Sequence, residues 1–180
     1  MLVTLVVVFR PLFGVRYPAM TDLPFHAAQT SALRHWFDDS YRFREQFGWH
    51  PIEVPYLTHY GLGALFMLAL PVVPAIKLAT GVVLGFVPLG VAALASGMKK
   101  SPLLGLGALP LVWCELTHWG FVSFVGALGL FAASLGLAMR LVDTPSRGRA
   151  FALGGVLVLV LITHPFRFPF ALLGVGLTAL

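Results

Sequence analysis

Acidic and imidazole side chains can bind metal ions and move protons, and in this chain they gather in one early segment. Five of the seven acids and three of the six histidines lie between Arg16 and Glu53. Asp22 and His26 stand four residues apart, so in a helix running to about Phe37 they would share one face. Together they could bind a divalent metal or share a proton transfer. The alternative is that Asp22 is only a helix cap and His26 only an interfacial side chain.

A second group of candidates lies farther along the chain, where apolar segments end. Glu115 is an isolated acid in a turn that also holds His118, and an acid at a membrane boundary is a functional candidate. The alternative for Glu115 is a solvated loop residue. His164 and Arg167 stand at another such end and could hold a phosphate. For these two, and for His59, simple interfacial anchoring is the competing interpretation.

The composition indicates that lipid surrounds the elements that position these residues. The chain is 58% hydrophobic and 11% charged, with a mean hydropathy of +0.89, whereas soluble domains are about one quarter charged. Uncharged runs such as Leu78–Met98 and Leu116–Met139 reach the roughly 20 residues needed to cross a bilayer. We therefore predict an all-α fold, a polytopic transmembrane helical bundle with a polar extracytoplasmic first loop that contains juxtamembrane helices. The basic residues are scattered, which argues against nucleic acid as a partner.

The predicted organisation is a single transmembrane domain over residues 1–180. Residues 1–15 form the first crossing, residues 16–73 an outer loop with interfacial helices, and residues 74–180 further crossings, including helices over about Pro102–Thr117 and Gly120–Leu141. Short loops rich in lysine and arginine belong in the cytoplasm, and two such loops follow residues 98 and 139. All six histidines then fall on the outer side. Alternatively, Tyr56–Leu70 spans the membrane and the early polar segment is cytoplasmic. Because the chain stops inside an apolar run, we expect it to be the front part of a longer protein.

The order of these features resembles the N-terminal half of the GT-C glycosyltransferases, a superfamily of polytopic membrane enzymes. The resemblance rests on a first helix followed by an acidic outer loop that begins Asp22-Leu23-Pro24-Phe25-His26, and then on Pro55-Tyr56 and an interfacial helix. Glu115 falls where the family places its second acidic site. The segments Trp119–Phe124 and Thr163-His164-Pro165 are similar to uncharacterised bacterial members. The chain departs from the family in having no Asp-x-Asp or Glu-x-Asp motif.

The resemblance implies a sugar transfer from a polyprenyl-phosphate donor to an acceptor on the outer face of the bacterial inner (cytoplasmic) membrane. It assigns Asp22 as the catalytic base or a ligand of a divalent metal, Mg²⁺ or Mn²⁺, with Glu115 assisting metal or acceptor binding. Five further residues are expected to bind substrate: His26, His59, His118, His164 and Arg167. The alternative function is a non-catalytic membrane protein, either a transporter fragment or an assembly subunit.

Overall fold

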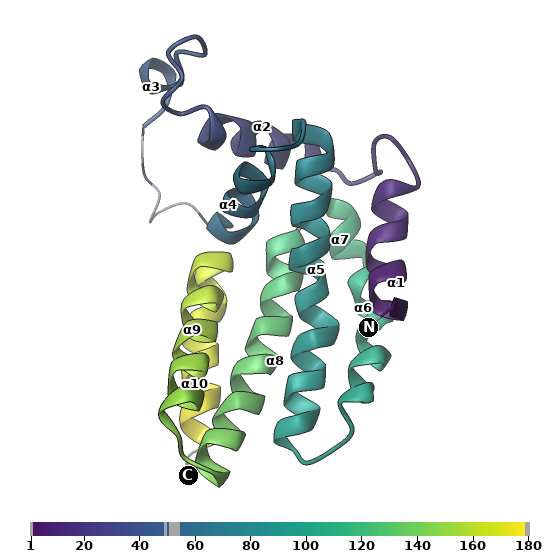
Figure 1. The fold of residues 1–180 in the computed structure, drawn as a ribbon, viewed down its shortest axis with the longest axis vertical. Helices are drawn as coiled ribbons and strands as arrows, with labels where there is room; N and C mark the ends of the chain where they lie inside the picture. Colours follow the sequence, from purple (N-terminus) through teal and green to yellow (C-terminus); the bar gives the residue numbers. More distant parts are fainter. Residues whose placement is uncertain (1, 49, 51–54, 179–180) are drawn as a thin grey trace.

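The computed structural model describes residues 2–48, 50 and 55–178, and over these residues the chain is helical, without strands (Figure 1). Glu53 and Trp49, both in the early polar segment, lie outside the described residues. The elements are α1 (Leu2–Phe13), α2 (Leu23–Arg34), α3 (Phe43–Gln46), α4 (Leu57–Phe66), α5 (Val72–Gly97), η1 (Pro102–Ala108), α6 (Leu109–Val112), α7 (Glu115–Trp119), α8 (Val122–Asp143), α9 (Arg147–Thr163), η2 (Pro165–Arg167) and α10 (Phe168–Leu177).

The centre of the molecule is a parallel pair of long helices, α5 and α8, packed through glycines. A Cβ atom added at Gly126 would meet Val83, and one added at Gly136 would meet the backbone of Ala93. The residue numbers rise together along both helices, so the two run in the same direction, as Figure 1 shows. Small residues allow such close backbone approach, which is how helices associate where the solvent is lipid.

Both helices of this pair are long and apolar enough to cross a membrane, by length and composition. Much of the outer surface is also apolar, since Phe151, Leu103 and Leu89 are 80%, 71% and 63% exposed. Monomeric soluble proteins rarely leave broad apolar patches uncovered. The helical fold class is confirmed, and within it α5 and α8 are the two candidate crossings in the described chain.

Two other predicted crossings differ from the structure. The helix expected over residues 1–15 is α1, whose twelve residues rise about 18 Å and fall short of a hydrocarbon core of about 30 Å. The continuous helix expected over Pro102–Thr117 is wrong, because this stretch divides into η1, α6 and α7. Gly105, Gly107 and Pro110 weaken α-helical continuity here, and the Ser101 hydroxyl instead caps a 3₁₀ helix by accepting from the Leu103 amide at 3.3 Å.

Side chains from neighbouring elements hold α1 against the bundle. Pro11 has no N–H, so the Val7 carbonyl lacks its helical donor, and the indole Nε1–H of Trp113 fills the gap at 2.8 Å. Past the end of α1, the buried Lys77 of α5 donates its Nζ to the Val15 carbonyl at 2.6 Å. The position of α1 therefore depends on specific polar contacts as well as on apolar packing.

The two ends of the bundle differ in charge, as the sequence predicts. Lys99 and Asp143 form an ion pair at 2.9 Å, which joins the two basic loops at the lower end in Figure 1. The described part of the early polar segment, with α2 and α3, lies at the opposite end together with α4. Helix α4 has ten residues and rises about 15 Å. That is the length of an interfacial or re-entrant helix rather than of the alternative crossing over Tyr56–Leu70.

Candidate functional site

Asp22 stands where the chain enters α2, and its backbone is docked on the end of α7. The Thr21 amide donates to the His118 carbonyl at 2.9 Å, and the Asp22 amide donates to the Trp119 carbonyl at 3.2 Å. Asp22 occupies the N-cap position of α2, as the alternative interpretation expects, but its side chain makes no capping hydrogen bond. Its half-buried carboxylate is held in place by the backbone and keeps its acceptor capacity.

Gly120 makes this docking possible. It ends α7 with a φ of +103°, in the left-handed region that favours glycine. A Cβ atom at this position would stand 2.6 Å from the Cβ of Asp22 and 2.8 Å from its amide nitrogen. The sequence analysis named Gly120 only as the start of a predicted helix and gave it no capping role. A glycine directly after a short helical turn is nevertheless a recognisable cap signal.

Replacing Gly120 by alanine is expected to destabilise the protein by about 3 kcal/mol, because the new methyl group is strained at positive φ and collides with Asp22. Thermal unfolding of the detergent-solubilised protein measures the loss. Gly148→Ala is the matched control, since nothing lies within 4 Å of a Cβ atom at that position in α9. Equal melting temperatures for the two variants would contradict the packing of Gly120 against Asp22.

His26 is 5% exposed and connects three segments through its ring. Its Nε2 lies 3.0 Å from the Gly120 carbonyl oxygen, and its Nδ1 lies 3.1 Å from the Tyr60 hydroxyl. A carbonyl only accepts, so Nε2 carries the proton and donates, and the Tyr60 hydroxyl then donates to Nδ1. Burial lowers the pKa of His26 against the opposing influence of the Gly120 carbonyl and Asp22, which favours this neutral form. With both nitrogens engaged, His26 does not serve as a metal ligand beside Asp22.

His59 is completely buried, 5.2 Å from the His26 ring between centroids. Its Nε2 lies 3.0 Å from the Thr80 hydroxyl oxygen of α5. Burial, with a smaller contribution from His26, lowers the pKa of His59 to about 3, so the ring is neutral at physiological pH. The expected role in substrate binding does not fit this geometry, because an imidazole inside the core cannot touch a ligand at the surface.

The buried His59 makes stability depend on pH. In the unfolded chain the imidazole has a pKa of about 6.5, so between that pH and about 3 the unfolded state binds the extra proton. Stability therefore falls as the pH is lowered through this window, by about 1.4 kcal/mol per pH unit. Chemical denaturation at pH 7 and pH 5 is expected to show a loss of about 2 kcal/mol from this group. In His59→Gln the slope should flatten, and an unchanged slope would contradict the assignment.

His164 and Arg167 lie together at the turn between α9 and α10. The His164 ring is 5.8 Å from the Tyr56 ring and 5.3 Å from the Phe124 ring, and the Arg167 guanidinium carbon lies 4.0 Å from the centroid of Phe124. Tyr56 also lies 5.8 Å from His26. The structure thus connects His26, His59, His164 and Arg167 through aromatic rings that the sequence interpretation did not treat as part of a site.

Glu115 and His118 lie on α7, the helix against which Asp22 is docked. Both side chains are exposed, and His118 donates Nδ1–H to the Cys114 carbonyl at 3.0 Å. Among the described residues, no group of three or more His, Cys, Asp or Glu side chains is placed to hold a metal ion. Asp22 and Glu115, the two ligands expected from the resemblance, are part of no such group, and the metal stays a prediction.

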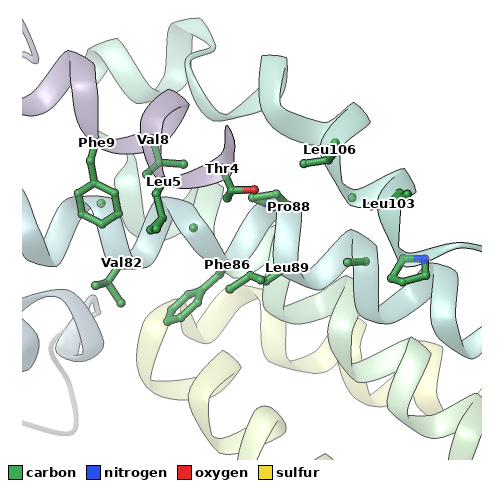
Figure 2. Close-up of a pocket in the computed structure, with 15 residues that line it drawn as sticks. Thr4, Leu5, Val8, Phe9, Val82, Phe86, Pro88, Leu89, Leu103 and Leu106 are labelled. Atoms are coloured by element: carbon green, nitrogen blue, oxygen red, sulfur yellow. The ribbon is translucent and has the colours of Figure 1, made fainter. Parts of the chain in front are cut away.

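A separate pocket of about 540 Å³ lies between α1, α5 and η1. Figure 2 shows Leu5 and Phe9 reaching from α1 toward α5, with Leu106 of η1 on the other side of Thr4. Among the residues lining this pocket, Thr4 has the one polar side chain. Its chemistry suits a hydrocarbon chain, and none of the candidate site residues lines it.

The other described acids of the early segment, Asp38, Asp39 and Glu45, lie on an exposed segment that includes α3. Asp39 pairs with Arg44, and Glu45 pairs with Arg42 at 2.5 Å. Asp38 accepts from the Ser40 amide at 3.0 Å. These partners lie on the same exposed segment, which agrees with the interpretation of the Asp38-Asp39 pair as a surface feature.

Comparisons of the whole chain with protein-family models, with curated proteins and with solved structures found no match. Any functional assignment of this chain therefore depends on the site just described.

Proposed function

We propose that this chain belongs to an integral membrane glycosyltransferase, which transfers a sugar from a polyprenyl-phosphate donor to an acceptor hydroxyl at the membrane surface. One observation carries the proposal. Asp22 and Glu115 are distant in sequence, yet Asp22 is docked by backbone hydrogen bonds on the same short helix, α7, that begins with Glu115. A catalytic base needs a fixed position and free carboxylate oxygens, and backbone hydrogen bonds provide the first without using the second.

In the proposed reaction, Asp22 takes the proton from the acceptor hydroxyl as that oxygen bonds to the anomeric carbon of the sugar. The bond from this carbon to the phosphate oxygen breaks, and its electron pair leaves with the polyprenyl phosphate. Glu115 is exposed on α7 and can accept hydrogen bonds from the acceptor. No step is assigned to Mg²⁺ or Mn²⁺, because the described residues do not gather a ligand set.

The location that fits this reaction is the outer face of the bacterial inner membrane. The lysine and arginine loops meet at one end of the bundle, and Asp22 belongs to the opposite end. Short basic loops usually stay in the cytoplasm, and this rule supports the proposal that the end that holds Asp22 is extracytoplasmic. The apolar pocket beside α1 supports a hydrocarbon-bearing partner, although it takes no part in the chemistry.

A transfer assay tests the proposal. Membranes containing the protein that carries this chain are incubated with polyprenyl-phosphate-linked [¹⁴C]mannose, glucose or galactose. Label is expected to leave the lipid-extractable fraction only when the protein is present. Retention of all label in lipid, with the protein folded and inserted, would contradict a transferase that uses these donors.

A non-catalytic membrane protein is the second candidate, and one observation favours it. Both ring nitrogens of His26 and Nε2 of His59 make hydrogen bonds that connect α2, α4, α5 and the α7–α8 junction. A buried polar network of this kind can have a purely structural role, which is to fix one packing arrangement. Full retention of fold but no transfer with any donor would favour this candidate.

A further inference from the structure

Two buried nitrogen atoms on the turn between α9 and α10 lack a hydrogen-bond partner within the described chain. They are Nδ1 of His164 and Nε of Arg167. Most buried polar atoms in folded proteins are paired, so each exception calls for an explanation such as a water or a ligand. Two exceptions three residues apart point to a shared acceptor that the chain itself does not supply.

The Arg167 guanidinium indicates that this acceptor carries a negative charge. All five N–H groups of arginine donate and the charge is permanent at physiological pH. No ion pair of Arg167 with a carboxylate occurs among the residues that the structure describes, and its cation rests on the Phe124 ring at 4.0 Å. Burial lowers the pKa of Arg167. A partly desolvated guanidinium that lacks a carboxylate partner favours the binding of an anion beside it.

His164 shares the same aromatic support. It is 8% exposed, and its ring packs edge-on against Phe124 at 5.3 Å. Neutral imidazole can carry its proton on Nδ1, so this atom can donate to the same anion as Arg167. Burial and the neighbouring Arg167 cation lower the pKa of His164, opposed by its own backbone. A bound oxyanion would remove the energetic cost of leaving this buried polar atom unpaired.

Exposed aromatic side chains lie beside this turn, as expected of a segment that contacts lipid. Phe166 and Phe170, beside and after Arg167, are 78% and 62% exposed, as expected of side chains that enter the acyl region. A phosphate offers several acceptor oxygens to an arginine fork and a second donor. We propose that the His164–Arg167 turn binds one phosphate group, with Nε of Arg167 and Nδ1 of His164 donating to its oxygens. Lipid phosphate and free phosphate share this chemistry.

Phosphate binding at the His164–Arg167 turn does not require that the chain transfer sugar. If the donor assay fails and phosphate binding persists, the proposed function is wrong and the site remains. If transfer occurs and phosphate binding is insensitive to Arg167, the site is wrong and the function remains. The two results are therefore distinguishable.

Native mass spectrometry of the whole protein in nonionic detergent provides the test. The ligands are phosphatidic acid, diacylglycerol with the same acyl chains, and inorganic phosphate. Phosphatidic acid is expected to bind at least about ten-fold more tightly than diacylglycerol, since only its phosphate accepts charge-assisted hydrogen bonds from Arg167 and His164. Competition by inorganic phosphate at millimolar concentration would identify a site that also takes the free ion. Equal binding of the two lipids would overturn the proposal.

Two variants locate the site. Arg167→Gln removes the cation, and His164→Phe keeps an aromatic ring without a donor. Each is expected to reduce phosphatidic acid binding about ten-fold while the melting temperature shows that the protein is folded. Arg34→Gln is the matched control, because Arg34 is an exposed arginine on α2 at the same end of the bundle. Unchanged binding in both site variants, or an equal loss in Arg34→Gln, would refute the assignment.

Discussion

Replacing Gly129 by leucine is expected to force α5 and α8 apart and to lower the free energy of unfolding by about 3 kcal/mol. A Cβ atom at Gly129 would meet the backbone of Phe86 and stand 2.5 Å from the Val87 amide nitrogen. Backbone atoms in the middle of a helix cannot yield as a flexible side chain would. Circular dichroism during heating in detergent measures the change as a lower melting temperature.

The control for this variant is Gly155→Leu in α9, where nothing lies within 4 Å of an added Cβ atom. Both substitutions raise intrinsic helix propensity by a similar amount, so the difference between them isolates the contact between α5 and α8. We expect Gly155→Leu to melt at or above the wild-type temperature. If Gly129→Leu does the same, the close parallel packing of these helices is wrong.

Replacing Asp22 by asparagine is expected to reduce sugar transfer by about 10²–10⁴-fold, the usual contribution of a general base. The amide has nearly the same shape as the carboxylate but does not accept a proton from an alcohol. Because the backbone of residues 21 and 22 holds this segment against α7, the fold should survive. The measurement is the rate at which label leaves the polyprenyl-phosphate donor, with insertion confirmed by membrane fractionation.

Asp38→Asn is the matched control for the Asp22 variant. Asp38 lies on the exposed loop between α2 and α3 and accepts from the Ser40 hydroxyl at 2.6 Å. Transfer by this variant should equal that of the wild type. Wild-type turnover by Asp22→Asn would remove Asp22 as the base, and a loss in both variants would point to a general effect of charge at this end of the bundle.

The parts of this fold that the sequence predicted are those set by local composition. Long apolar runs gave α5 and α8, and the charges placed Lys99 and Asp143 at one end. The segment from Pro102 to Thr117 was mispredicted because hydropathy does not distinguish an α-helix from an apolar 3₁₀ turn rich in glycine and proline. The first helix was predicted with nearly the right bounds, but α1 is shorter than a bilayer core is thick.

The candidate site was harder to predict, because its contacts join residues far apart in sequence. His26 and Gly120 are 94 residues apart, yet they share a hydrogen bond. No spacing rule reveals which histidines are buried, so His59 was expected at a surface and lies in the core. Phe124 was named only within a segment that carries the resemblance. Its contact with the Arg167 guanidinium depends on how α8 packs against the α9–α10 turn, which the sequence does not show.

The parallel course of α5 and α8 has a consequence for biosynthesis. Two neighbours that run the same way require the chain to climb back between them, and this return passes through η1, α6 and α7. A 3₁₀ helix gains about 2.0 Å per residue, so the seven residues of η1 rise about 14 Å. Unpaired carbonyls in such a segment are costly against acyl chains. η1 and α6 pack against α5, which leaves the ribosome before them, so we expect this ascending stretch to dock on α5 as it is synthesised.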